Sequence, residues 1–364
     1  MNDFATAVAP HEPAQAVGPP LLEVEELRTT FSTQHGTVRA VDGVSLQLRP
    51  GETLGVVGES GSGKSVMGRT VMGLISSDGT TSVSGRVLLA GNDVHALKPA
   101  RRRRLWGPEV AMVFQDPMTS LNPVKKVGTH LIEPLRLHLG LGKAEASERS
   151  VELLQQVGIP EPTRRLRQYP HELSGGMRQR VVIAMALACK PRLLIADEPT
   201  TALDVTVQKQ ILDLLASLAE DLQMATILIS HDLSAVAGRT DRVAVMYGGR
   251  IMETSASERV FVDPWHPYAE ALIRSIPQID APSHSTLRVI EGSPLNMVDP
   301  PPGCSFNPRC RLATSLCEEH VPALRDLGTS DSPHAVACHH PLGPAGTSAR
   351  APHDEREDGS TDGR

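Results

Sequence analysis

Aromatic residues are scarce in this 364-residue sequence, at 3% of all positions. The hydrophobic fraction is nevertheless 40%, so a core can form, and it must be built from Leu, Val, Ile, Ala and Met. Long hydrophobic runs are absent as well, because no segment reaches the roughly 18 apolar residues of a membrane-spanning helix. We therefore expect a cytosolic protein that is tied to a membrane only through partners.

An excess of positive charge is also missing. The net charge is −6, which gives no reason to expect general nucleic-acid binding. The strongest basic cluster, Arg101 to Arg104, has two interpretations: a solvated helix face, or a contact with anionic lipid headgroups. The N-terminus lacks the basic and apolar regions of a secretory signal. We expect disordered tails over residues 1–20 and 343–364.

Cysteine is rare, with five residues, but four of them lie in one stretch: Cys304, Cys310, Cys317 and Cys338. A reducing compartment argues against disulfides. Four thiolates can hold zinc or an iron–sulfur cluster, and the thiols can also be free and structural. The spacings are wider than those of common zinc sites and differ from the usual ferredoxin run, so they leave all three open. Cys189, in an apolar helix, is expected to be a small core residue.

The hydrophobic pattern predicts an α/β protein. Short alternating runs over Leu21–Leu48 indicate antiparallel strands, and Thr53–Val57 indicates a buried strand before a helix that starts at Lys64. Strand signals vanish over about residues 116–175, which we interpret as a helical insertion. Helices and strands then alternate, which predicts a largely parallel sheet. The expected domains are a large one over 21–264 and a smaller one with the cysteine cluster over 265–342.

The segment Gly58-Glu-Ser-Gly-Ser-Gly-Lys-Ser65 follows a predicted strand, starts a predicted helix and has the form G-x-x-x-x-G-K-[ST]. Its glycines let backbone N–H groups wrap phosphates, and the helix N-terminus favours anions. Lys64 would supply a charge to the β- and γ-phosphates, and Ser65 a hydroxyl to Mg²⁺. The expected nucleotide-binding residues here are Gly58, Glu59, Ser60, Gly61, Ser62, Gly63, Lys64 and Ser65.

A second buried strand ends in Asp197 and Glu198. We expect Asp197 to hold Mg²⁺ and Glu198 to orient the water that attacks the γ-phosphate, as in-line hydrolysis requires. The alternative is that both acids serve as helix caps. A lone histidine is commonly structural, but His231 follows a strand at the same edge, which favours a γ-phosphate contact.

Leu173-Ser-Gly-Gly-Met177 opens another predicted helix. Ser174, with the N–H groups of Gly175 and Gly176, therefore forms a second anion site. A chain that already has a phosphate loop does not need this site for its own nucleotide. The site becomes useful if it serves the γ-phosphate held by a partner chain.

In this order the motifs resemble those of the ATP-binding subunits of ABC importers of the dipeptide/oligopeptide type. The resemblance implies an ABC-type P-loop ATPase domain with a RecA-like core, an antiparallel β subdomain and a helical subdomain. It implies that Phe31 stacks on adenine, that Gln115 contacts Mg²⁺ and couples to the membrane subunit, and that Ala202-Leu-Asp204 forms the D-loop. The family's signature and switch histidine match the second anion site and His231. Phe31 replaces a more usual Tyr, which preserves stacking.

Narrower strings point to the peptide branch, above all Gly303-Cys-Ser-Phe-Asn-Pro-Arg-Cys310 and His266-Pro-Tyr268. The family implies ATP hydrolysis that energises import of dipeptides or oligopeptides. Two cassettes, usually related but different chains, share composite ATP sites beneath two permease subunits and an extracytoplasmic binding protein, at the cytoplasmic face of the membrane. The cargo could instead be nickel or glutathione. A soluble cassette ATPase that is not coupled to transport is the alternative class.

Some peptide-importer ATPases of this type carry a [4Fe–4S] cluster on cysteines of the same region. The resemblance therefore implies such a cluster on Cys304, Cys310, Cys317 and Cys338, in a structural or redox-sensing role.

Overall fold

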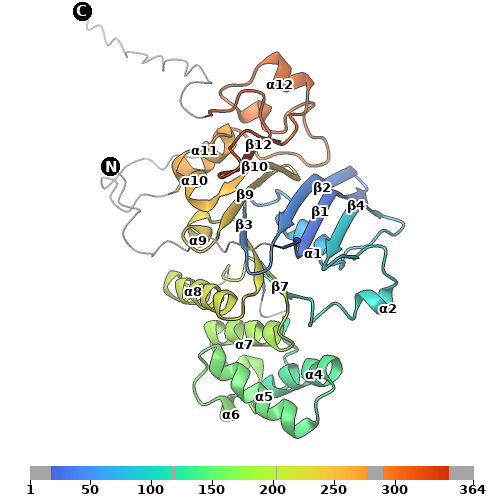
Figure 1. Cartoon of the computed structure of the whole chain (residues 1–364), viewed down its shortest axis with the longest axis vertical. Helices are drawn as coiled ribbons and strands as arrows, with labels where there is room; N and C mark the ends of the chain where they lie inside the picture. Colours follow the sequence, from blue (N-terminus) through green and yellow to red (C-terminus); the bar gives the residue numbers. More distant parts are fainter. Residues whose placement is uncertain (1–17, 117–119, 202, 277–289, 344–364) are drawn as a thin grey trace, which may run out of the picture.

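The computed structural model describes residues 18–116, 120–201, 203–276 and 290–343. Two β-sheets lie in one half of the molecule, and a group of helices forms the opposite end (Figure 1). The predicted α/β fold, with an antiparallel sheet, a sheet built largely of parallel strands and a helical part, is confirmed. The expected tails lie outside the described residues, apart from residues 18–20 and 343.

The smaller sheet is antiparallel, in the order β2-β1-β4-β5. Its first strands mix buried and exposed side chains, so one face packs into a core while the other meets solvent. Leu22, Leu27 and Val44 belong to a cluster that also contains residues of α1 and of the larger sheet. The strands are β1 Leu22–Thr33, β2 Gly36–Leu48, β4 Thr81–Leu89 and β5 Asn92–Asp93.

The larger sheet, over the described residues, has the strand order β11-β12-β10-β9-β3-β8-β7-β6. The five strands from β9 to β6 are parallel, and β10, β12 and β11 continue the sheet in antiparallel pairs. The central strands are buried along their whole length, as a sheet covered on both faces requires. The strands are β3 Thr53–Val57, β6 Val110–Val113, β7 Leu193–Asp197, β8 Ala225–Ser230, β9 Arg242–Tyr247, β10 Arg250–Ala256, β11 Arg325–Asp326 and β12 His334–Val336.

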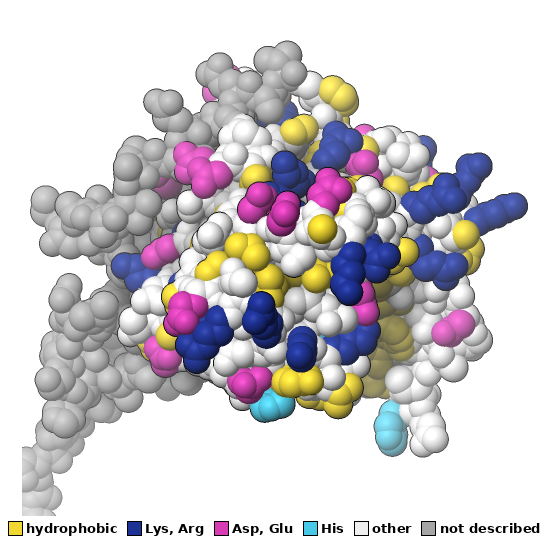
Figure 2. All heavy atoms as spheres, turned by 90° about the horizontal axis from the view of Figure 1, so that it is seen from below, with side chains coloured by type: hydrophobic (Ala, Val, Ile, Leu, Met, Phe, Trp, Pro, Cys, Tyr) yellow, Lys and Arg dark blue, Asp and Glu magenta, His cyan; other side chains and the backbone are white. Residues whose placement is uncertain are grey.

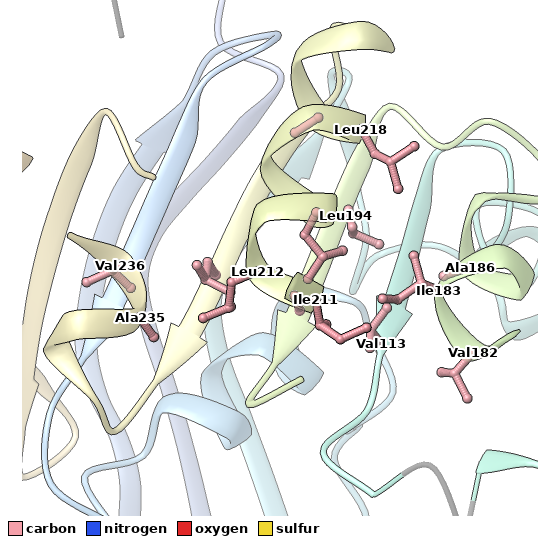
Figure 3. Packing of buried hydrophobic residues seen from close by; sticks show 14 of the residues in the cluster. Val113, Val182, Ile183, Ala186, Leu194, Ile211, Leu212, Leu218, Ala235 and Val236 are labelled. Atoms are coloured by element: carbon pink, nitrogen blue, oxygen red, sulfur yellow. The ribbon is translucent and has the colours of Figure 1, made fainter. Parts of the chain in front are cut away.

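Helices cover both faces of the larger sheet. Figure 3 shows part of one core cluster, in which Ile211 of α8 and Ile183 of α7 pack with the sheet residues Leu194 and Val113. Among the described residues, no helix is both long and apolar enough to cross a membrane. The helices against the sheet are α1 Lys64–Val71, α7 Gly175–Leu187, α8 Val205–Asp221 and α9 Leu233–Val236.

The helical end coincides with the segment predicted to be helical. Figure 2 views this end, over which Lys and Arg side chains lie beside hydrophobic patches. Leu137, on its surface, is 79% exposed. The basic cluster starts in a separate short helix, α2 Pro99–Arg102, where Arg102 bonds the carbonyl of Gly73. The helices of this end are α4 Val127–Leu139, α5 Lys143–Gln156, α6 Pro162–Arg165 and the 3-10 turn η2 Pro170–Glu172.

The C-terminal segment returns to the larger sheet. β12 pairs with β10, so residues that are far apart in the sequence share one sheet (Figure 1). The sequence analysis did not predict these strands, and the domain boundary at residues 264 and 265 stays a prediction. The other elements of this segment are α10 Ser257–Val262, α11 Pro267–Arg274, η3 Asn307–Arg309 and α12 Ser315–Glu319.

Candidate functional site

Three neighbouring parallel strands deliver the polar groups of the candidate site to one edge. The glycine loop follows β3, Asp197 is the last residue of β7 and His231 follows β8. Since β3 pairs with β8 and β8 with β7, their carboxyl ends meet. This is the edge of an open α/β sheet at which ligands bind.

The glycine loop needs its glycines for steric reasons. Gly58 and Gly63 have φ of 151° and 98°. A Cβ on Gly58 would lie 2.1 Å from the Met246 carbonyl oxygen, and one on Gly63 would lie 2.0 Å from that of Ala40. Gly63 also caps α1, so the loop ends on a helix N-terminus. Backbone N–H groups at such a helix start favour anions.

Lys64 is held inside the loop. Its side chain is buried, and Nζ donates to the carbonyl oxygens of Gly58 and Glu59, both at 2.8 Å, and to Ser62 Oγ at 3.3 Å. Burial lowers the pKa of Lys64, against the opposing effect of the nearby carboxylates of Glu198 and Asp197. Because hydrogen bonds from an ammonium group to an anion are stronger than those to neutral carbonyl oxygens, an anionic ligand can replace these carbonyls as the partner of Lys64.

Asp197 is fully buried. Its Oδ1 accepts a hydrogen bond from Ser65 Oγ at 2.6 Å, and Arg69 Nη2 lies 3.5 Å from Oδ2. Oδ2 has no hydrogen-bond partner among the described residues. Burial is the main cause of a raised pKa of Asp197, and the Ser65 hydrogen bond opposes it. An under-coordinated buried carboxylate beside a hydroxyl is a donor set that suits Mg²⁺.

Glu198 collects the remaining predicted groups. Its Oε2 accepts from Gln115 Nε2 at 2.9 Å and from Thr201 Oγ1 at 3.1 Å, and His231 Nδ1 lies 3.0 Å from the same oxygen. Glu198 has φ of 46°. A left-handed non-glycine residue is a strained position of the kind that clusters at functional sites.

These residues fit a nucleoside triphosphate with Mg²⁺. Glycine at positions 58 and 63 lets the loop pack closely against the Met246 and Ala40 carbonyls, and nothing lies within 4 Å of a Cβ position on Gly61, so the loop backbone is open to a phosphate there. Asp197 Oδ2 and Ser65 Oγ offer oxygen ligands to the metal, and Lys64 offers a cation to the phosphates.

The second anion site lies elsewhere on the chain. Ser174 caps α7 by accepting from the N–H of Met177 at 3.3 Å. A Cβ on Gly176 would lie 2.8 Å from Val207 Cγ1, so this glycine lets α7 approach α8. Asp204 caps α8 through the N–H of Val207 at 3.0 Å. Within the described residues, no hydrogen bond or ion pair joins Ser174, Gly175 or Gly176 to the glycine loop.

The other predicted site residues are placed as follows. Phe31 lies partly exposed in β1, opposite Val38 of β2 and Thr81 of β4. Nothing lies within 4 Å of a Cβ position on Gly61, so this part of the loop is open. Ser60 is exposed, like its neighbour Gly61 at the tip of the loop. Ala202 of the predicted D-loop lies outside the described residues.

Comparison with known proteins assigns this arrangement to a class. The ATP-binding cassette MJ0796, in a dimeric post-hydrolysis state bound to ADP and Pi, matches with a TM-score of 0.59 and 26% identity, covering 65% of this chain and 98% of that chain. The family described as "ABC transporter" matches residues 41–201. The fold and the glycine loop therefore define an ABC-type ATPase.

More specific relatives narrow the class. Residues 252–317 match the family described as "Oligopeptide/dipeptide transporter, C-terminal region". The oligopeptide transport ATP-binding protein OppD of Escherichia coli (strain K12) is 48% identical over 322 residues, which is 88% of this chain and 94% of that protein. The dipeptide transport ATP-binding protein DppD of Haemophilus influenzae is 47% identical over 326 residues, or 90% and 97%. The chain belongs to this family of oligopeptide and dipeptide transport ATP-binding proteins.

The predicted iron–sulfur cluster is wrong. Across the described ranges, no group of three or more Cys, His, Asp or Glu side chains is arranged to hold a metal ion. Burial raises the pKa of the Cys304 and Cys310 thiols, and it raises that of Cys338 to about 12. The four free cysteines Cys304, Cys310, Cys317 and Cys338 instead line an apolar pocket.

Sequence reasoning missed two neighbours of the acidic pair. Thr201 follows Glu198 by one tight turn, and its hydroxyl also bonds the Glu198 carbonyl at 3.2 Å. Arg69 lies one turn of α1 beyond Ser65 and reaches Asp197. The i, i+4 spacing from Ser65 to Arg69 was a signal that could have indicated this second contact.

Proposed function

We propose that this chain hydrolyses ATP to energise the import of dipeptides or oligopeptides through a membrane ABC transporter. The observation that carries the proposal is the carboxylate of Glu198, on which Gln115 and His231 converge beside the glycine loop. The 48% identity to an oligopeptide transport ATP-binding protein supports the peptide cargo.

The residues divide the work of hydrolysis. The loop N–H groups and Lys64 bind the β- and γ-phosphates, while Ser65 and Asp197 hold Mg²⁺. The bound metal supplies charge neutralisation at the phosphate oxygens. Glu198 orients the attacking water, and His231 and Gln115 fix the Glu198 carboxylate and respond to the γ-phosphate. Phe31 stacks on the adenine.

A second cassette completes the site. Among the described residues, no hydrogen bond or ion pair joins Ser174, Gly175 or Gly176 to the chain's own glycine loop, which supports a role at the nucleotide of a partner. The cassette MJ0796 is described as dimeric. We propose that this chain pairs with a related ATPase subunit, and that Asp204, which caps α8 next to the α7–α8 contact, lies at the shared interface.

The transporter's other parts are inferred from the relatives. Two permease subunits and an extracytoplasmic peptide-binding protein would complete an importer, with this chain at the cytoplasmic face of the membrane. The exposed apolar side chains of the helical end, Leu137 and Val124, support docking of a permease there. Gln115 begins the segment that leads from the nucleotide to that end.

The proposal is tested by Glu198→Gln with the partner subunits present. Since the amide cannot polarise water, ATP hydrolysis should fall at least about 100-fold while ATP binding is retained. Glu109→Gln is the matched control, because Glu109 precedes β6 at the opposite edge of the same sheet, where it pairs with Arg192. Unchanged hydrolysis in Glu198→Gln would contradict the assignment.

A further inference from the structure

The C-terminal segment contacts the glycine loop directly. Arg309, at the end of η3, forms a two-pronged ion pair with Glu59, from Nη1 to Oε2 at 2.7 Å and from Nη2 to Oε1 at 3.0 Å. Tyr268 of α11 accepts the backbone N–H of Glu59 at 2.9 Å through its hydroxyl. Residue 59 of the loop is thus held at its backbone and at its side chain by a region 209 to 250 residues later in the sequence.

The guanidinium of Arg309 is fully used. Its other donors go to Tyr247 Oη at 3.3 Å, the Glu291 carbonyl at 2.9 Å and the Ile290 carbonyl at 3.2 Å. The side chain is only 5% exposed, and it lies 5.9 Å and 6.0 Å from the ring centres of Tyr247 and Phe306. A surface ion pair contributes little to stability, but this part-buried, bidentate pair, in which the Arg309 donors are all used, holds a fixed geometry.

The platform under this ion pair is aromatic and rigid. Tyr247, Tyr268 and Phe306 pack with ring centres 4.6 to 5.4 Å apart. Tyr247 ends β9, which neighbours β3, and Phe306 comes from the C-terminal segment. In a chain with few aromatic residues, three of them gather where the C-terminal segment meets the loop.

Glu59 places a negative charge in a loop that binds a polyanion. Burial lowers the pKa of Lys64, and the Glu59 carboxylate is one of the nearby negative charges that oppose this lowering. An unpaired carboxylate here would repel the phosphates of ATP, because like charges a few ångströms apart interact unfavourably. Arg309 removes that repulsion.

We propose that Arg309 is a positioning residue for nucleotide binding, which neutralises Glu59 and so makes the ATP affinity of the glycine loop depend on the C-terminal segment. The inference rests on the proposed function, since it requires that the loop bind ATP. It gives the His266-Pro-Tyr268 and Gly303–Cys310 strings a role at the ATPase site, through Tyr268 and Arg309.

The test is a double-mutant cycle on the full chain, read out as the Kd for ATP with Mg²⁺. Arg309→Gln should weaken binding about tenfold in the wild-type background and less than twofold in a Glu59→Gln background, because the repulsive charge is then absent. Once the partner subunit is present, KM for ATP should rise while kcat changes little, a split that general loss of fold would not give.

Arg311→Gln is the matched control, because Arg311 lies two residues away and pairs with Glu270, away from the loop. It should change the Kd less than twofold. If Arg309→Gln does not fold, Arg309→Lys keeps the positive charge without the fork, and its Kd should stay within about threefold of wild type.

Equal losses from Arg309→Gln in both backgrounds, or no loss in either, would overturn the inference. A tenfold loss in a folded Arg309→Lys variant would also overturn it. A wild-type chain that does not bind ATP, or that binds no better than Lys64→Ala, would contradict the proposed function itself, so the two failures are distinguishable.

Discussion

At the scale of single residues, the site contains a carboxyl group, Asp197, whose charged form is disfavoured by burial. Asp197 is fully buried, and burial raises its pKa above the ordinary value of 3.8. Its native state binds a proton more tightly than the unfolded chain does. The free energy of unfolding therefore falls as pH rises from 3.8 through the folded-state pKa of Asp197.

Asp197→Asn should therefore stabilise the nucleotide-free chain by about 1 kcal/mol at pH 7. The amide oxygen still accepts from Ser65, and the unfavourable charge is gone. Denaturant unfolding at several pH values measures this, and the gain should shrink as the pH is lowered toward 3.8. The same variant should lose the stabilisation that ATP with Mg²⁺ gives the wild type. A variant less stable than wild type at pH 7 would contradict this account.

The central site residues could be proposed from the sequence because their spacing is local, and their roles stay predictions. The glycine loop and the pair Asp197 and Glu198 each follow a buried strand. The contacts that join these segments were not readable. Thr201 and Arg69 depend on side-chain direction, and the Glu59–Arg309 pair spans 250 residues. The cysteine spacing left zinc, an iron–sulfur cluster and free thiols open, and the cluster predicted from the family resemblance is wrong because the described residues contain no group arranged to hold a metal ion.

At the scale of elements, the glycine loop is shaped by two close backbone approaches. Gly63 has φ of 98°, and its Cβ position lies 2.0 Å from a carbonyl oxygen of β2. Gly61 also has a positive φ, of 81°, but nothing lies within 4 Å of its Cβ position. A side chain at position 61 would therefore meet only the strain of a positive φ, whereas one at position 63 would also collide with the backbone of Ala40.

Gly63→Ala should lower the free energy of unfolding by about 3 kcal/mol or more, because the Ala40 backbone must move. Gly61→Ala should cost about 1 kcal/mol, from the strained φ alone. Equilibrium unfolding without nucleotide compares them directly. Equal stabilities of the two variants would show that the contact with Ala40 does not shape the loop.

The strands predicted from local alternation or from buried runs all form, and β3 has the predicted bounds. β10 and β12 were missed for a physical reason. β10 buries the polar residues Glu253 and Ser255, and β12 is only three residues long, so neither shows a strand's hydrophobic pattern. Their pairing depends on partners that a local window does not contain.

At the scale of the whole molecule, a buried contact between a histidine and a glutamate holds the C-terminal segment on the sheet. His334 Nε2 of β12 lies 2.6 Å from Glu253 Oε1 of β10, and both side chains are 0% exposed. The Glu253 oxygens also accept the N–H groups of Trp265 and His266, and the Trp265 ring stacks on His334 at 3.8 Å. One carboxylate thus joins β10, β12 and the start of α11.

His334→Ala should destabilise the chain by about 3 kcal/mol, since it removes a buried hydrogen-bond partner of Glu253 and opens a space beside Trp265. His320→Ala is the control, because His320 is exposed at the end of α12, and its effect should stay within about 0.5 kcal/mol. Thermal unfolding of both variants checks this. A stable His334→Ala chain would mean that the C-terminal segment does not depend on the pair.

The central claim, that ATP hydrolysis at Glu198 drives peptide import, is tested most directly by uptake in cells whose only copy of this subunit is wild type or Glu198→Gln. Labelled dipeptide, longer peptide and Ni²⁺ are supplied in parallel. The account predicts that peptide uptake is lost in the variant while Ni²⁺ uptake is unchanged. Peptide uptake at the wild-type level in Glu198→Gln cells would contradict it, and a loss confined to Ni²⁺ would contradict the peptide cargo.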